Sequence, residues 1–161
     1  MDLTRLLPPN HTIINLSPSS REDALRQLAQ PLVDSGIVTD IDEFCTDLEI
    51  REQQITTVIG NAVAIPHART KSATRLGLTV GLLEEGKTFK FSDDEEAEEG
   101  EEVEEINLLF MIAIPSFAPA SHLPLLQHLA RFVRYEKKLT KLLKSRTPAA
   151  AAKYLHSFKS K

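Results

Sequence analysis

The sequence lacks the features that mark secreted, membrane-spanning and disulfide-stabilised proteins. Its single cysteine, Cys45, cannot form an intramolecular disulfide, and its neighbours Phe44 and Leu48 indicate the apolar stripe of a helix. No run approaches the roughly eighteen consecutive apolar residues of a membrane span, and the N-terminus has no basic, apolar and small-residue signal pattern. We therefore expect a cytoplasmic protein without membrane insertion.

The motifs of several enzyme classes are also missing. The chain has no P-loop, no Rossmann fingerprint and no Ser-His-Asp arrangement, so a nucleotide-binding or hydrolase interpretation has no support. A metal site that used His67 and His122 would need a third ligand at a recognisable spacing, and the sequence offers none. We expect neither a metal nor a cofactor.

Charge is distributed unevenly, although the net charge is only −4. The segment Asp93 to Glu105 contains ten carboxylates and no basic residue, whereas the chain from Arg131 onward has ten Lys or Arg residues and one acid, Glu136. The acidic segment has no apolar period, so we expect a mobile surface insertion at about residues 92–105. A basic face can bind nucleic acid, but no nucleic-acid motif accompanies this one, and we interpret it as a solvated helix face.

Apolar periodicity predicts a single α/β domain over residues 1–161. The chain is 42% hydrophobic, which is enough for one substantial core. Helices are predicted where a capping signal precedes apolar residues at helical spacing, and strands where short aliphatic or β-branched runs end in Gly, Pro or charge. These rules predict strands at residues 11–16, 63–65, 76–83, 88–91 and 106–114, and helices after the capping pairs Ser19/Glu22 and Asp40/Glu43 and at 121–134, 136–144 and 148–158.

The segment from Ile106 to Ile114, INLLFMIAI, is apolar without alternation. Such a run is typical of a strand that is covered on both faces. We therefore predict a mixed β-sheet with helices on both faces and with this strand at its centre.

Of the five histidines, His67 is the one whose surroundings suggest chemistry. It directly follows Pro66 after an apolar strand, and we expect it to emerge where that strand leaves the sheet, a common place for active-site groups. Residues 69–72 (Arg-Thr-Lys-Ser) supply donors and positive charge suited to an incoming phosphate. A lone histidine after proline is more often structural, so this pattern alone does not assign a role.

The stretch from Arg51 to Thr70, REQQITTVIGNAVAIPHART, closely resembles the active-site segment of the type-2 enzyme IIA family of the bacterial phosphoenolpyruvate-dependent phosphotransferase system. This is the fructose and mannitol class, which also includes the nitrogen-regulatory enzyme IIA. An Arg-Glu pair ends a helix, a Thr-rich segment leads to residues 59–61 (IGN), and residues 64–69 (AIPHAR) contain the family's phospho-accepting histidine. Further along, residues 109–114 and 121–123 (SHL) resemble the family's central strand and its second histidine.

The resemblance implies a phosphocarrier that acts as a phosphotransferase. His67 would accept a phosphoryl group from the histidine phosphocarrier protein, Arg51 would contact the phosphoryl oxygens, and His122 would assist as a neighbouring donor. Elementary chemistry agrees, because neutral imidazole is a nucleophile near physiological pH and arginine offers a planar fork to two oxygens. At a helix start, His122 would also feel the positive end of the helix dipole, which favours neutral imidazole.

The fate of the phosphoryl group stays open at this point. It could pass to a IIB component for sugar uptake, or the phosphorylation state of His67 could control a regulated target protein, as in nitrogen regulation. The alternative is a non-catalytic regulatory binding module that keeps only the fold, and the intact set of His67, Arg51 and His122 argues against it. The chain departs from the family pattern in its acidic insertion and in the apolar lead into His122, residues 115–120 (PSFAPA), so the sequence names neither the partner nor a sugar.

Overall fold

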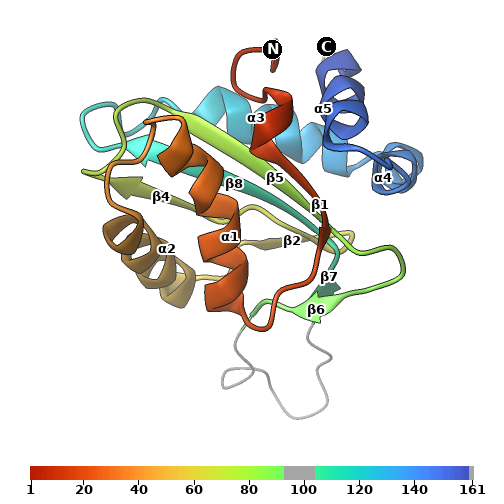
Figure 1. Ribbon diagram of the computed structural model, residues 1–161, viewed down its shortest axis with the longest axis horizontal. Coiled ribbons are helices and arrows are strands. Elements are labelled where there is room, and N and C mark those ends of the chain that lie inside the picture. Colours follow the sequence, from red (N-terminus) through yellow and green to blue (C-terminus); the bar gives the residue numbers. More distant parts are fainter. Residues whose placement is uncertain (93–103, 160–161) are drawn as a thin grey trace.

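The computed structural model describes residues 1–92 and 104–159, and it shows a sheet between two layers of helices (Figure 1). Most of the expected acidic insertion at about residues 92–105 lies outside the described residues. None of the described helices has the length and apolarity that crossing a membrane requires. The elements in chain order are η1 (Pro9–His11), β1 (Thr12–Leu16), α1 (Arg21–Asp34), α2 (Ile41–Gln54), β2 (Val58–Gly60), β3 (Val63–Ala64), β4 (His67–Thr70), β5 (Gly77–Leu83), β6 (Phe89–Lys90), β7 (Glu105–Ile106), β8 (Leu108–Pro115), α3 (Leu123–Val133), α4 (Glu136–Leu143) and α5 (Pro148–Ser157).

The main sheet has six strands in the order β1-β5-β8-β3-β2, and β4 also pairs with β8. β8 runs antiparallel to β5 and parallel to β3 and β4, so the sheet is mixed. Every residue of β8 is buried. The prediction of a central strand in the 106–114 region is confirmed, except that Ile106 lies in β7, which pairs with β6 in a separate ribbon.

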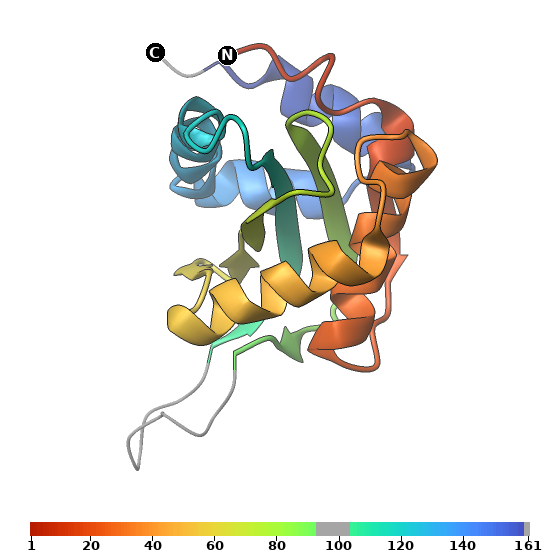
Figure 2. The same ribbon diagram turned by 90° about the vertical axis from the view of Figure 1, so that its left-hand side faces the viewer.

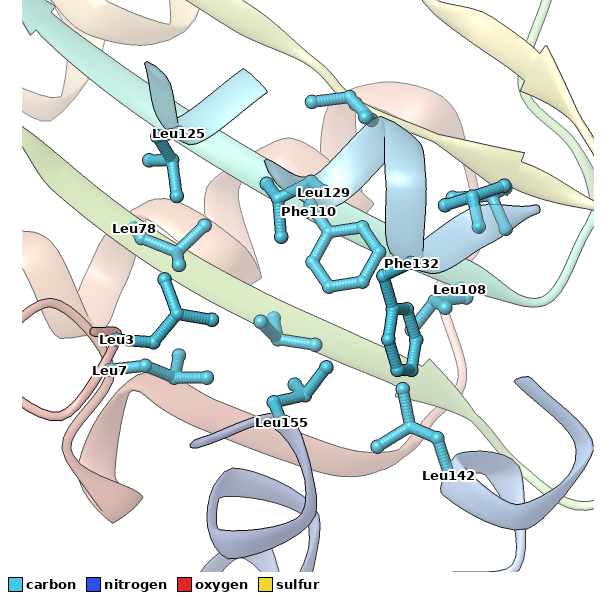
Figure 3. Close-up of a cluster of buried hydrophobic side chains, with 14 of the residues drawn as sticks. Leu3, Leu7, Leu78, Leu108, Phe110, Leu125, Leu129, Phe132, Leu142 and Leu155 are labelled. Carbon is cyan, nitrogen blue, oxygen red and sulfur yellow. The ribbon is translucent and has the colours of Figure 1, made fainter. Parts of the chain in front are cut away.

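Both faces of β8 are apolar because helices cover each of them. Its alternate residues from Leu108 onward pack with α3, α4 and α5, and the residues between them, from Leu109 onward, pack with α1 and α2. Figure 2 shows the sheet between these two helical layers. In the first layer, the ring of Phe110 meets that of Phe132 from α3 edge to face, with ring centroids 6.4 Å apart (Figure 3). The predicted α/β architecture with helices on both faces is confirmed.

Two glycines in β5 let α1 lie directly on the sheet. A Cβ atom at Gly77 would lie 3.0 Å from Cδ2 of Leu32, and one at Gly81 would lie 2.7 Å from Cδ2 of Leu28. Both distances are shorter than carbon–carbon contact allows. α1 packs against α2, and α2 packs against β4, so this close approach helps to place α2 beside the strand that carries His67.

The helix starts follow the predicted capping chemistry with one shift. Asp40 caps α2 as expected, because its carboxylate accepts a hydrogen bond from the backbone N–H of Glu43 at 3.1 Å. α1 is capped by Ser20 instead of Ser19, and its hydroxyl accepts from the backbone N–H of Asp23 at 3.0 Å. The predicted capping pair Ser19/Glu22 is therefore wrong by one residue. The pair that caps the helix, Ser20 and Asp23, has the same spacing.

The chain around His67 does not leave the sheet, so that expectation is wrong. β3 and β4 both run parallel to β8, and His67 is the first residue of β4, opposite Ile112. Pro66 cannot donate to the ladder, but its carbonyl accepts a hydrogen bond from the N–H of Ile112 at 2.9 Å. The sheet thus continues past the proline. The backbone of His67 is held by the pairing of β4 with β8, while its side chain stays partly exposed.

Candidate functional site

The structure brings His67, Arg51 and His122 to one pocket of about 370 Å³. His67 comes from β4, Arg51 from the last turns of α2, and His122 from the residue directly before α3. Arg69 and Asp47 also line this pocket. The three residues that the sequence singled out are therefore neighbours, although as many as 71 positions separate them along the chain.

The ring of His67 is oriented by its own backbone. Its Nδ1 lies 2.7 Å from the carbonyl oxygen of Ile65. Because a carbonyl oxygen can only accept a hydrogen bond, Nδ1 carries the proton in the neutral ring and Nε2 keeps its lone pair. This arrangement selects the tautomer in which Nε2 carries the free lone pair.

The surroundings of His67 favour its neutral form. Burial lowers the pKa of His67 below its ordinary value of 6.5, the hydrogen bond to Ile65 opposes this change, and the charge of Arg51 adds to it. The charges of Glu52 and Arg69 have smaller and opposite effects on this pKa. The ring is consequently neutral at neutral pH.

His122 lies beside His67 but is differently constrained. The two ring centroids are 5.7 Å apart with an interplanar angle of 28°, and only 5% of His122 is exposed. Its Nδ1 is buried and has no hydrogen-bond partner among residues 1–92 and 104–159. Burial lowers the pKa of His122, and His67 and Arg69 lower it further. As expected, His122 is found where a helix begins.

Arg51 is held at the C-terminal end of α2. Its Nη1 donates a hydrogen bond of 2.8 Å to the carbonyl oxygen of Ile55, the residue that follows the helix. A guanidinium group has five N–H donors, so this contact fixes the side chain and leaves most of its donating capacity for an anion in the pocket.

Of residues 69–72, which the sequence analysis expected to face a phosphate, only Arg69 lines the pocket. Its Nε donates to the carbonyl oxygen of Pro119 at 2.9 Å, which ties the apolar lead into His122 to β4. Thr70 and Ser72 are buried and share a hydrogen bond of 2.8 Å between their hydroxyls. Arg69 therefore supplies charge to the pocket and also restrains the segment that precedes His122.

Sequence reasoning missed Glu52, the neighbour of Arg51. Only 7% of Glu52 is exposed, and its carboxylate accepts hydrogen bonds from the backbone N–H and the hydroxyl of Thr57. One signal was available, because Glu52 lies four residues after Leu48 and seven after Cys45, on the apolar stripe of α2. A carboxylate at such a position predicts a buried and hydrogen-bonded charge.

Apolar side chains are exposed close to this pocket. Ile50 lines it and is 52% exposed. Phe117 and Leu123, in the segments before and after His122, are 76% and 53% exposed. Large apolar side chains at such exposure around a charged pocket are typical of a surface that docks another protein. In the ranges that the structure describes, no group of three or more His, Cys, Asp or Glu side chains is placed to hold a metal ion.

Known proteins resemble this chain in sequence. A family model described as "Phosphoenolpyruvate-dependent sugar phosphotransferase system, EIIA 2" matches residues 5–158. The fructose-specific EIIA component from Haloferax volcanii is 31% identical over 144 residues, which cover 89% of this chain and 88% of that protein. The fructose-specific EIIABC component of Bacillus subtilis is 27% identical over 150 residues, which cover 93% of this chain and 22% of that longer protein.

Solved structures share the fold. The nitrogen regulatory protein IIA-Ntr from Neisseria meningitidis superposes with a TM-score of 0.79 at 18% identity, covering 95% of this chain and 98% of that one. The mannitol IIA of Escherichia coli gives a TM-score of 0.74 at 18% identity, covering 92% of this chain and 98% of that one. Together with the family match over residues 5–158, these likenesses establish that the chain belongs to the type-2 EIIA family of the phosphoenolpyruvate-dependent sugar phosphotransferase system.

Proposed function

We propose that this EIIA domain accepts a phosphoryl group on Nε2 of His67 from the histidine phosphocarrier protein and passes it to a IIB component. The observation that carries the proposal is the hydrogen bond between Nδ1 of His67 and the carbonyl of Ile65, which leaves the Nε2 lone pair available. A nitrogen that is already deprotonated needs no general base, and the pocket accordingly needs only to place and neutralise the phosphoryl group.

The proposed transfer of the phosphoryl group needs no proton acceptor, because one phosphorus–nitrogen bond forms as another breaks. The Nε2 lone pair of His67 forms a bond to phosphorus while the phosphorus–nitrogen bond of the donor phosphohistidine breaks, and the donor nitrogen keeps that electron pair. The product ring carries phosphorus on Nε2 and hydrogen on Nδ1, so the ring is formally cationic. The carbonyl of Ile65, 2.7 Å from Nδ1, stabilises this charge. The same steps in reverse order deliver the group to the next acceptor.

The basic side chains of the pocket supply the electrostatic part of the mechanism. Arg51 and Arg69 offer guanidinium donors to the phosphoryl oxygens, against one lining carboxylate, Asp47. The ring of His122 lies beside that of His67 and lines the same pocket, so a ring N–H of His122 can donate a hydrogen bond to a phosphoryl oxygen held there. These contacts strengthen as negative charge is shared between donor, phosphorus and acceptor.

A IIB component fits best as the acceptor. The fructose-specific relative from Haloferax volcanii matches nearly the whole chain, which favours sugar uptake over nitrogen regulation. The IIA subunit in a complex of mannitol IIA with phosphorylated mannitol IIB from Escherichia coli has the same fold, with a TM-score of 0.75. The exposed side chains of Ile50, Phe117 and Leu123 provide an apolar surface for such a partner.

The test is reconstitution of the phosphorylation. Incubated with phosphoenolpyruvate, enzyme I and the histidine phosphocarrier protein, the wild-type chain gains one acid-labile, base-stable phosphoryl group, and His67→Ala gains none. His156→Gln is the matched control, because His156 contacts the carbonyl of Leu7 far from the pocket, and it labels fully. Labelling of His67→Ala, or label that survives acid, would show that the assignment is wrong. Label that no IIB component removes would favour the regulatory alternative.

A further inference from the structure

Glu52 is a buried charge that the proposed transfer does not use. It follows Arg51 on α2, but it points into the protein and is only 7% exposed. Its carboxylate accepts two hydrogen bonds from a single residue, from the backbone N–H of Thr57 at 2.7 Å and from the Thr57 hydroxyl at 2.5 Å. A buried carboxylate is costly without such partners, and two contacts to one residue fix that residue in both position and orientation.

Thr57 in turn holds the residue that orients the reactive ring. The carbonyl oxygen of Thr57 accepts a hydrogen bond from the backbone N–H of Ile65 at 3.0 Å. The carbonyl oxygen of Ile65 then accepts the hydrogen bond from Nδ1 of His67 at 2.7 Å. Every step from Glu52 to the His67 ring is therefore a contact of hydrogen-bond length, and each contact holds the residue that makes the next one.

This path matters because Ile65 lies in the gap between two short strands. β3 ends at Ala64 and β4 begins at His67, so Ile65 and Pro66 are outside both ladders. The carbonyl of Pro66 is held by β8 through the N–H of Ile112. The backbone N–H of Ile65 is held instead by Thr57, whose own position depends on Glu52.

We propose that Glu52 is a positioning residue that acts through Thr57 and Ile65 to keep the Nδ1–H tautomer of His67 and to aim Nε2 into the pocket. The proposal rests on His67 being the phosphoryl acceptor, but the tautomer exists in the unphosphorylated protein and can be measured there. The negative charge of Glu52 also lies close enough to raise the proton affinity of the His67 ring, and it stabilises the cationic phosphorylated ring in the same way.

Two nearly isosteric substitutions separate the hydrogen bonds from the buried volume. In Glu52→Gln, the amide oxygen can accept from the N–H of Thr57 and the amide NH₂ can donate to the Thr57 hydroxyl, so both contacts survive without the charge. Glu52→Leu fills the same space but offers no acceptor. Thr57→Val keeps the shape of Thr57 and removes only the hydroxyl contact, so it reports on the same path if Glu52→Leu fails to fold. Leu139→Ala, a buried change on α4, is the control for general loosening of the fold.

The first measurement is the ¹⁵N spectrum of the imidazole nitrogens of unphosphorylated protein at a pH where His67 is neutral. Wild type, Glu52→Gln and Leu139→Ala should show the Nδ1–H tautomer of His67. Glu52→Leu should show a mixture with the Nε2–H tautomer, and Thr57→Val a smaller change in the same direction. An unchanged tautomer in both Glu52→Leu and Thr57→Val, or the same change in Leu139→Ala, overturns the proposal.

The second measurement is the rate of phosphorylation by the phosphorylated histidine phosphocarrier protein. Glu52→Leu should be slower than wild type by roughly ten- to a hundredfold, the loss expected when a reacting group is misplaced by up to about 1 Å. Glu52→Gln should recover most of that loss, and a Gln variant as slow as the Leu variant contradicts positioning by hydrogen bonds. If wild type is never phosphorylated, the proposed function fails, while the tautomer measurement still decides the role of Glu52.

Discussion

His67 and His122 are neighbouring histidines that differ in the hydrogen-bond partner of Nδ1. Burial lowers the pKa of both, so both rings are neutral at neutral pH. Nδ1 of His67 meets the carbonyl of Ile65, which leaves the lone pair of the opposite nitrogen free for the attack that we propose. Nδ1 of His122 is buried and meets no partner within the described parts of the chain, so no acceptor at this atom fixes the tautomer of that ring. In the proposed transfer, this difference would make His67 the nucleophile and leave His122 as a supporting donor.

Replacing Arg51 tests the charge-assisted contact to the phosphoryl group. Arg51→Ala leaves the nucleophile in place but removes a contact worth about 1.5 to 3 kcal/mol, so transfer should slow by roughly ten- to a hundredfold. Arg51→Lys keeps the charge without the planar fork and should recover only part of the rate. The transfer rate of His122→Ala should lie between those of wild type and Arg51→Ala. Rapid-quench measurement of single-turnover phosphorylation gives all four rates, and an Arg51→Ala rate equal to wild type would remove Arg51 from the mechanism.

The hairpin between β2 and β3 stores backbone strain just ahead of the site. Gly60, Asn61 and Ala62 all have positive φ angles, of 103°, 53° and 61°. Glycine and asparagine tolerate this region, but alanine does not adopt it readily. The Ala62 N–H donates to Oε1 of Glu104 at 2.7 Å, and the Asn61 amide donates to the carbonyl of Val133 at 2.8 Å. These contacts hold the turn in place against the strain.

Ala62→Gly should therefore stabilise the protein. Relief of the left-handed strain gains about 1 to 2 kcal/mol, and the extra freedom of glycine in the unfolded chain removes about half of it, so a net gain of about 0.5 to 1 kcal/mol is expected. Urea unfolding measures the change. Ala130→Gly, the same substitution in the middle of α3, should have the opposite sign and cost about 1 kcal/mol. A loss of stability in Ala62→Gly would mean that the turn is not strained.

The elements also show which features the sequence could predict. β8 was predictable because INLLFMIAI has no alternation, which requires cover on both faces. β4 was not, because Pro66 ends the apolar run and residues 67–70 (HART) are short and polar, so only the pairing with β8 makes them a strand. The resemblance pointed to His67, Arg51 and His122 among the pocket residues, and the fold brings these three together. The hydrogen-bond path from Glu52 could not be predicted, because it joins backbone groups whose approach depends on tertiary packing.

For the molecule as a whole, the pocket lies where the two helical layers meet across the sheet. Arg51 belongs to the layer of α1 and α2, His122 immediately precedes α3 of the opposite layer, and His67 comes from the sheet between them. The geometry of the pocket thus depends on the packing of both cores. A substitution that loosens either layer, such as one at Gly77 under α1, should alter transfer without touching a pocket residue.

Four histidines that are buried or partly buried link the stability of the whole molecule to pH. Burial is the largest cause of a lowered pKa at each of them, relative to the ordinary value of 6.5. Their unfolded forms bind protons near pH 6.5, whereas the folded forms bind them only at lower pH. As pH falls below about 6.5, the unfolded state therefore takes up more protons and gains stability relative to the folded state. The residues are His11, His67, His122 and His128.

The free energy of unfolding should accordingly be lower at pH 5.5 than at pH 7.5, by on the order of 1 kcal/mol or more. Urea titrations at the two pH values measure this difference. The pKa values of Asp2 and Asp23 are lowered by hydrogen bonds from their ordinary value of 3.8, so these carboxylates lose their contribution only at more acidic pH and do not obscure the effect. His11→Gln should reduce the difference, because glutamine can donate to the carbonyl of Leu78 as His11 does but does not titrate. Equal stability at both pH values, or a difference unchanged in His11→Gln, would mean that burial of these rings does not set the pH dependence.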